Sequence, residues 1–141
     1  MKPLKMYMAV HEAAHGVVAI SLGGYAEEIS ILPDGAREGY CHVSWPNDGA
    51  DRRDEKLIVL AAGAAAVSLY RKQGLDLAIL DSGYGDLLRM KELGDTSDHW
   101  FKTAKRICRT FWPEIMRVAR GALATGTLRE IEIDEAMEAA A

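Results

Sequence analysis

Two histidines and a glutamate lie close together near the N-terminus, in His11-Glu12-Ala13-Ala14-His15. If this segment is an α-helix, residues four positions apart leave the same face one turn apart, so both imidazoles can bind one metal ion. Glu12 then lies beside the metal-bound water, where a carboxylate can accept a proton. This is the H-E-x-x-H arrangement of zinc hydrolases. It predicts a zinc site with His11 and His15 as ligands and Glu12 as the catalytic base.

The simpler alternative is a chance match in a helix whose histidines are ordinary and partly buried. The flanking residues Val10, Val17 and Val18 indicate a helix that faces the core. Glutamate and histidine are costly on so apolar a face unless they are paired or bind a metal. The apolar flanks therefore favour the metal site.

The bulk composition is that of an ordinary globular protein. With 141 residues, 49% of them hydrophobic, we expect a single domain over residues 1–141. The net charge of -4 gives no general attraction to nucleic acid or to anionic lipid. Cys41 and Cys108 are too few for a disulfide framework, which favours a reducing cytoplasm. The apolar N-terminal segment contains His11, Glu12 and His15, so we expect no membrane span.

The elements that position the motif follow from residue spacing and from turn-forming residues. A helix from Met6 to about Leu22 should end at Gly23-Gly24, because glycine readily adopts the left-handed conformation past a helix end. Two short strands, at 28–32 and 39–45 around the turn Pro33-Asp34-Gly35, predict a β-hairpin lying against this helix. A helix with an alanine-rich, buried middle is expected over 51–72, capped by Gly74, with a loop over 75–85.

The second half of the chain is predicted to be helical. Asp86 should open a short helix over 87–93, where a carboxylate at a helix start is the ordinary explanation for this residue. A longer helix at 100–111 should be divided from 114–124 by Trp112-Pro113, and a last short helix is expected at 134–139. We therefore expect an α+β, mostly α fold: a zincin-like helix, a small β-hairpin and a C-terminal helical bundle.

A catalytic zinc site usually has three protein ligands, so one ligand must come from outside the first helix. Composition and spacing leave several candidates open, because each is a metal-binding residue type beyond that helix. A lone cysteine on a short strand is more often simply packed. The candidates are His42, His99, Asp81, Asp86, Asp95, Asp98, Glu55 and Cys41.

Several segments of the chain resemble the FtsH-type (M41) zinc metallopeptidases. The segment 10–19, Val-His-Glu-Ala-Ala-His-Gly-Val-Val-Ala, is similar to the metal-binding helix of that family. The segment 29–35 followed by Gly39-Tyr40 resembles its hairpin, and 60–66 resembles its small-residue helix. Ser82-Gly83-Tyr84-Gly85-Asp86-Leu87 resembles its Gly/Ser-rich segment, which ends in Asp-Leu.

In that family the aspartate of the last segment is the third zinc ligand, and the resemblance assigns this role to Asp86. Two residues depart from the family pattern. Ala14 stands where the helix usually has glycine, and Val67 replaces a glutamate, which removes a polar contact near the site. The family's ATPase and membrane segments are absent, so ATP-driven unfolding is not expected of this chain alone. A separate ATPase or adaptor is a candidate partner.

Two functions of different class are compatible with these features. The first is a stand-alone zinc endopeptidase that acts on flexible or unfolded polypeptides through a metal-activated water. The second is a catalytically inactive, metal-stabilised interaction module. Its best feature is a row of cations on the 100–111 helix, although we expect these to form a solvated face with the neighbouring aromatic residues packed inward. The cations are Lys102, Lys105, Arg106 and Arg109.

Overall fold

The computed structural model describes residues 5–32, 39–46 and 51–139 of the chain. The fold is mostly helical with one small antiparallel sheet, which is the α+β, mostly α class that the sequence predicts. In chain order the elements are α1 (Met6–Ser21), β1 (Tyr25–Ser30), β2 (Tyr40–Ser44), α2 (Arg53–Arg71), α3 (Leu75–Ala78), the π-helical turn η1 (Ile79–Gly83), α4 (Tyr84–Glu92), α5 (Asp98–Thr110), α6 (Trp112–Thr125), β3 (Thr127–Arg129) and α7 (Glu130–Glu138).

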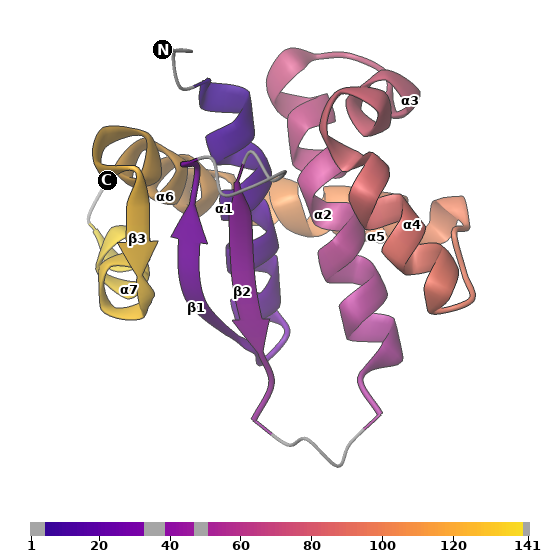
Figure 1. The fold of residues 1–141 in the computed structure, drawn as a ribbon, viewed down its shortest axis with the longest axis horizontal. Coiled ribbons are helices and arrows are strands. Elements are labelled where there is room, and N and C mark those ends of the chain that lie inside the picture. The colour runs from indigo at the N-terminus through magenta and orange to yellow at the C-terminus, as the bar shows by residue number, and fades with distance from the viewer. Residues whose placement is uncertain (1–4, 33–38, 47–50, 140–141) are drawn as a thin grey trace.

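The helix that carries the two histidines, α1, is the centre of the fold. It contacts the sheet on one side, α2 on another and α6 on a third (Figure 1). Nearly every residue from Ala9 to Ala19 is buried, as expected for an apolar helix surrounded by other elements. The helix ends at Ser21, and Gly23 follows with a φ of +95°, which confirms the predicted glycine termination.

The strands β1 and β2 form the predicted antiparallel hairpin, with Ile29 opposite Cys41 and Ser30 opposite Tyr40. The hairpin packs against α1, as expected. The predicted turn at Pro33-Asp34-Gly35 lies outside the described residues.

A third strand, β3, is a correction to the sequence-based fold. The segment 125–127 was expected only to lead into the last helix, but Thr127–Arg129 pairs with β1, with Leu128 opposite Ile29. The resulting sheet order is β2-β1-β3, so β2 lies at an edge. The helix α7 also begins earlier than predicted, at Glu130. Three residues are too few to display the alternation by which a strand is recognised in a sequence.

The small-residue helix α2 lies beside α1 and is buried through its middle, from Ala61 to Ser68, as predicted. Alanine and glycine there allow the two helices to approach closely. The prediction that Gly74 caps this helix is wrong. Lys72 adopts the left-handed conformation at its end, with a φ of +52°, and Gly74 instead precedes α3.

The prediction of a loop over 75–85 is also wrong, because this segment is helical. It runs as α3, η1 and α4, and we call these three consecutive elements the arm. The arm packs along α2, with Ala78, Gly83 and Met90 buried. Gly83 lies so close to α2 that an added Cβ would be 2.8 Å from the Cβ of Ala64. Tertiary packing against α2 therefore outweighs the turn-forming composition of the segment.

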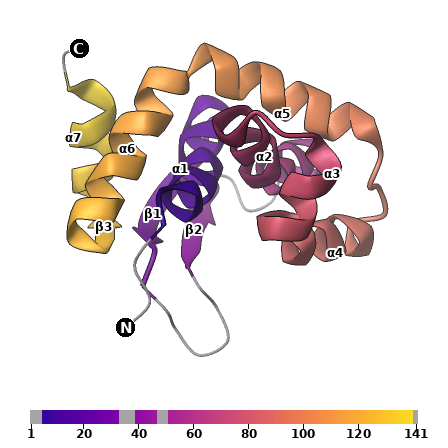
Figure 2. The ribbon, with the colours of Figure 1, turned by 90° about the horizontal axis from the view of Figure 1, so that it is seen from above.

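The C-terminal helices follow the prediction more closely. Figure 2 shows α6 and α5 running in an arc along the top of the picture, with α6 against α1 and α5 against α2. Pro113 lies in the first turn of α6, where proline is tolerated. On α5 the aromatic residues Trp100 and Phe101 are buried and Lys102, Arg106 and Arg109 are exposed, as expected for a solvated face. Lys105 is the exception, because it is half-buried and donates a hydrogen bond to the hydroxyl of Ser68. Within the described residues, no helix combines the length and the apolarity needed to span a bilayer.

Candidate metal centre

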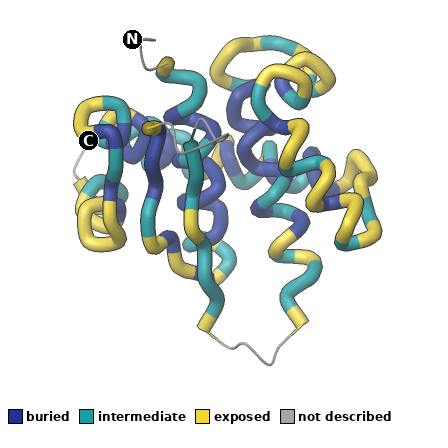
Figure 3. Tube along the Cα trace, viewed as in Figure 1, coloured by how far each residue is buried: buried dark blue, intermediate teal, exposed yellow. Residues whose placement is uncertain are grey.

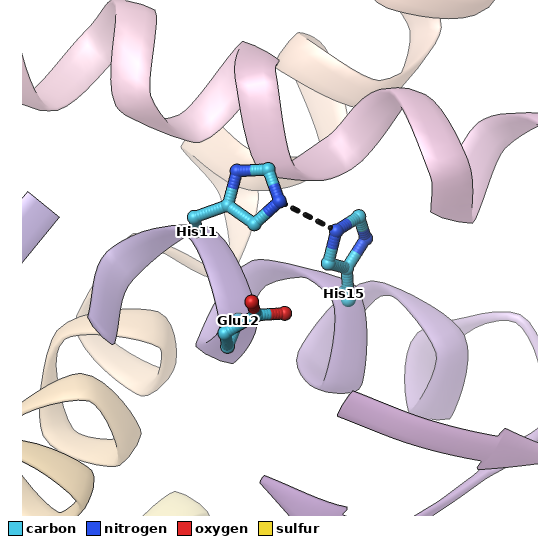
Figure 4. Close-up of side chains that lie close together, drawn as sticks. All are labelled: His11, Glu12 and His15. Carbon is cyan, nitrogen blue, oxygen red and sulfur yellow. Dashed lines mark hydrogen bonds between the residues drawn. The ribbon is translucent and has the colours of Figure 1, made fainter. Parts of the chain in front are cut away.

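His11 and His15 project from one face of α1 toward α2 and are almost completely buried, with 6% and 7% of their surfaces exposed. Their rings meet edge to face, at an interplanar angle of 81°. The two Nε2 atoms are 3.0 Å apart (Figure 4). The four-residue spacing on a helix thus brings one nitrogen of each ring to a common point, as the sequence predicts.

Asp86 reaches the same point from α4. Its Oδ2 atom lies 3.0 Å from Nε2 of His11 and 3.0 Å from Nε2 of His15. Asp86 lies in the first turn of α4, as predicted for a carboxylate at a helix start, but the N-cap is Gly83 and no side chain caps the helix. Burial alone would raise the pKa of the Asp86 carboxyl, but the charge of His15 and hydrogen bonds to both histidines hold that pKa well below its usual range.

The second nitrogen of each ring has its own partner, and these partners assign the tautomers. Nδ1 of His15 lies 2.7 Å from the carbonyl oxygen of Val59, so this nitrogen donates its hydrogen. Nδ1 of His11 lies 3.2 Å from the hydroxyl of Ser82, which donates its own hydrogen to the carbonyl of Ala78. Both Nδ1 atoms therefore hold the proton of a neutral ring. Both Nε2 atoms face the carboxylate of Asp86, where each can bind a metal ion as part of a neutral ring or donate a hydrogen bond to Oδ2 when its ring is protonated.

Three electron-pair donors that converge in this way repel one another unless a cation lies among them. Ligand atoms of tetrahedral zinc, each about 2.0–2.2 Å from the metal, are about 3.3 Å apart. The three donor atoms here are separated by 3.0 Å on each side. Two imidazoles and one carboxylate form a known donor set of catalytic zinc. The residues present therefore fit a zinc ion.

In the metal-free protein a proton replaces the cation. Burial lowers the pKa of His15, but the Asp86 carboxylate, its hydrogen bond to the ring, the charge of Glu12 and the Val59 carbonyl together raise it to about 9. The cluster therefore attracts a positive charge both with and without metal: a metal ion in the first case and a proton in the second.

Glu12 completes the cluster. Its carboxylate and the ligand nitrogens of both histidines all lie within 4.8 Å of one another (Figure 4). Unlike the two histidines, Glu12 is only half-buried. A Cβ built on Gly39, just before β2, would lie 3.2 Å from its Oε2 atom, so the carboxylate extends toward β2. Glu12 is thus close to the ligand nitrogens of both histidines, and together these three residues form a group that could hold a metal ion.

Sequence reasoning missed three residues that support His11 and His15. Gly63 of α2 faces the ring of His11, and a Cβ there would be 2.6 Å from its Nε2 atom. Ser82 and the carbonyl of Val59 orient the two rings. For Gly63 the only signal in the sequence was a glycine within an alanine-rich helix. A backbone carbonyl, such as that of Val59, leaves no signal in a sequence.

The other candidate ligands do not bond to either histidine in the part of the chain that the structure describes. Asp81 forms an ion pair of 3.0 Å with Arg71, and the ring of His42 stacks on that of Tyr40. In the metal-free protein, burial and the charges of Glu12 and Asp86 raise the pKa of the Cys41 thiol. The remaining candidates lie at the starts of helices or in the segment before α5: Glu55, Asp95, Asp98 and His99.

A cleft of about 1070 Å³ opens beside the cluster. Its walls come from α1, β2, α2 and the arm, so the three donors and Glu12 lie at the meeting point of four elements. The strand β2 contributes every residue from Tyr40 to Ser44 to the lining. A polypeptide segment lying in the cleft would therefore run beside this strand.

No protein-family model matches the chain, and no curated protein is significantly similar to it. The resemblance to FtsH-type peptidases therefore depends on the sequence motifs themselves. The two residues that depart from the family pattern, Ala14 and Val67, are both fully buried in the core.

Proposed function

We propose that this protein is a zinc-dependent endopeptidase that hydrolyses peptide bonds in flexible or unfolded polypeptides. The observation that carries the proposal is the convergence of His11, His15 and Asp86, whose donor atoms are 3.0 Å apart, while Nδ1 of each ring has a separate partner.

His11, His15 and Asp86 would hold the ion. When bound, zinc supplies a Lewis acid that polarises a carbonyl group and lowers the pKa of water. Glu12 accepts the proton of the attacking water and passes it to the leaving amine, since its carboxylate lies beside the donors and is accessible from the cleft.

The substrate class follows from the position of β2. This strand is at the edge of the sheet and lines the cleft, so an extended peptide can pair with its outer edge. Backbone pairing depends little on side-chain identity, which favours loose specificity. A compactly folded substrate has no free segment of this kind. A separate ATPase or adaptor that unfolds substrates would be compatible with this mode of binding.

A cytoplasmic location belongs to the same proposal. Both cysteines are free, and the Cys108 thiol is fully buried. A reducing compartment suits a chain with two unpaired thiols.

The test uses the zinc-loaded chain with two substrates, an unfolded casein-like protein and a compact stable one. We expect chelator-sensitive cleavage of the unfolded substrate alone, lost in Glu12→Gln while zinc stays bound. Glu92→Gln is the matched control, because Glu92 is a carboxylate in the same cleft but not in the cluster. If no unfolded substrate is cleaved although zinc binds, the inactive, metal-stabilised interaction module becomes the better account.

A further inference from the structure

Two basic side chains line the cleft beside the candidate metal centre. They are Lys56 of α2 and Arg89 of α4. Both are exposed, and neither forms an ion pair with any residue that the structure describes. Figure 3 shows the first turns of α2 and much of α4 to be half-buried or exposed. Because an exposed cation is commonly only solvated, the position of these two decides whether they serve the cleft.

Each cation lies one helical turn from a group that bonds to a metal-binding histidine. Arg89 follows Asp86 by three positions on α4, and residues three apart share a helix face. Lys56 precedes Val59 by three positions on α2, and the carbonyl of Val59 accepts the hydrogen bond from His15. Three residues advance a helix by about 4.5 Å. Both long side chains therefore reach the space next to a peptide bond held at the metal centre.

The two cations also lie on the same side of the metal centre, because α2 and α4 pack in opposite directions. Gly83, directly before α4, lies against Ala64 of α2. At the other end of the contact, Nε of Arg53 donates a hydrogen bond of 2.9 Å to the carbonyl of Leu93. Residues between these two contacts follow the same antiparallel order. The cations are therefore at one level, between the Arg53 contact and the metal centre.

This end of the cleft carries an excess of positive charge. One carboxylate, that of Glu92, lines the cleft a turn beyond Arg89, farther from Asp86, and it pairs with neither cation. A divalent ion in the metal centre would offset the carboxylates of Asp86 and Glu12. Two cations at one level repel each other, and an anion between them removes the repulsion. The net charge of the whole chain is -4, so this excess is local to the cleft.

We propose that Lys56 and Arg89 bind a carboxylate of the substrate next to the scissile bond. The inference rests on the proposed peptidase function and adds a preference to it, because pairing with β2 involves only the backbone of the substrate. A guanidinium binds a carboxylate through two parallel hydrogen bonds, and an ammonium adds a further donor. Aspartate and glutamate side chains supply this group, as does the C-terminus of a peptide, and the test separates these sources.

Peptide binding tests the inference without turnover. The zinc-loaded Glu12→Gln chain is titrated calorimetrically with unstructured peptides, capped at both ends, that differ only in a central glutamate, glutamine or lysine. We expect the glutamate peptide to bind about three- to tenfold more tightly than the glutamine peptide, as one or two exposed ion pairs allow. The lysine peptide should bind most weakly. If a glutamine peptide with a free C-terminal carboxylate binds more tightly than the capped glutamate peptide, the site stands and its ligand is a chain end.

Charge reversal in the same Glu12→Gln chain identifies the cations. Arg89→Glu should abolish the preference for a carboxylate, and Lys56→Gln should reduce it. Lys91→Glu is the matched control, since Lys91 is also exposed on α4 but does not line the cleft, and it should keep the preference. Circular dichroism checks that each variant is folded.

Two results would overturn the inference. One is equal affinity for the glutamate and glutamine peptides together with no gain from a free C-terminus. The other is a loss of preference in Lys91→Glu as large as in Arg89→Glu, which would assign it to overall charge. A carboxylate preference in a chain whose wild type cleaves nothing would count against the peptidase alone, because the binding assay needs no turnover.

Discussion

The imidazole of His11 lies directly against the backbone of Gly63, where a Cβ would come 2.6 Å from its Nε2 atom. The contact joins α1 to α2 at the candidate metal centre. Gly63→Ala should displace the ring, weaken zinc binding and destabilise the fold by about 1–3 kcal/mol, as overpacking does in a core. Titration with zinc and thermal unfolding measure the two effects.

Gly85→Ala is the control for this prediction. Gly85 lies in α4 beside Asp86, but a Cβ there would meet no atom within 4 Å. We expect unchanged zinc affinity and unchanged or slightly higher stability, since alanine favours a helix over glycine by about 1 kcal/mol. Equal zinc affinity in both variants would show that the space at Gly63 is not needed.

The hydroxyl of Ser82 accepts a hydrogen bond from Nδ1 of His11 and thereby fixes the tautomer that leaves Nε2 free. Ser82→Ala removes this partner, and loss of such outer-shell contacts commonly costs 10–100-fold in metal affinity. Competition with a zinc chelator measures the change. Because Ser97 lies far along the chain, before α5, Ser97→Ala should bind zinc as wild type does. An unchanged affinity in Ser82→Ala would remove this residue from the site.

The sequence predicted the elements whose pattern is local. The helix α1 and the divided pair α5 and α6 have clear periodicity and clear ends, at Gly23 and Pro113. The strand β3 and the arm were missed because both depend on distant partners: β3 on pairing with β1, and the arm on packing against α2. Local propensity does not contain such contacts.

The residues of the candidate site also divide into those that local sequence predicts and those that depend on distant parts of the chain. His11, Glu12 and His15 follow from helical spacing alone. Asp86 required the resemblance to a family, because nothing in its own segment separates it from Asp81 or Asp95. Gly63 and Ser82 were missed because their roles arise only when α2 and the arm are brought against α1.

The metal-free protein should lose stability as pH rises above neutrality. The pKa of His15 is about 9 when folded and about 6.5 when unfolded, so its stabilisation is complete below about pH 6.5 and is lost toward pH 9. The Asp86 pKa is lowered, so its stabilisation is present above about pH 4 and is lost in acid. Between pH 6.5 and 9 the free energy of unfolding should fall by up to about 1.4 kcal/mol per pH unit.

Thermal unfolding of chelator-treated protein across this pH range measures the decline. Asp86→Asn is the control, because it removes the charge that raises the His15 pKa and should abolish most of the decline. Zinc should reverse the trend, since it binds the deprotonated imidazoles and binds more tightly as pH rises. A metal-free melting temperature that stays level or rises from pH 6.5 to 9 would contradict the assigned ion pair.

The zinc content of the purified chain after dialysis, measured by elemental analysis, tests the metal centre most directly. It should be compared among wild type, His11→Ala, Asp86→Ala and the control Asp81→Ala, whose carboxylate pairs with Arg71 outside the cluster. We predict about one zinc per chain in wild type and in Asp81→Ala, and almost none in His11→Ala and Asp86→Ala. About one zinc retained by either of the latter two variants would contradict the assignment of His11, His15 and Asp86 as the ligands.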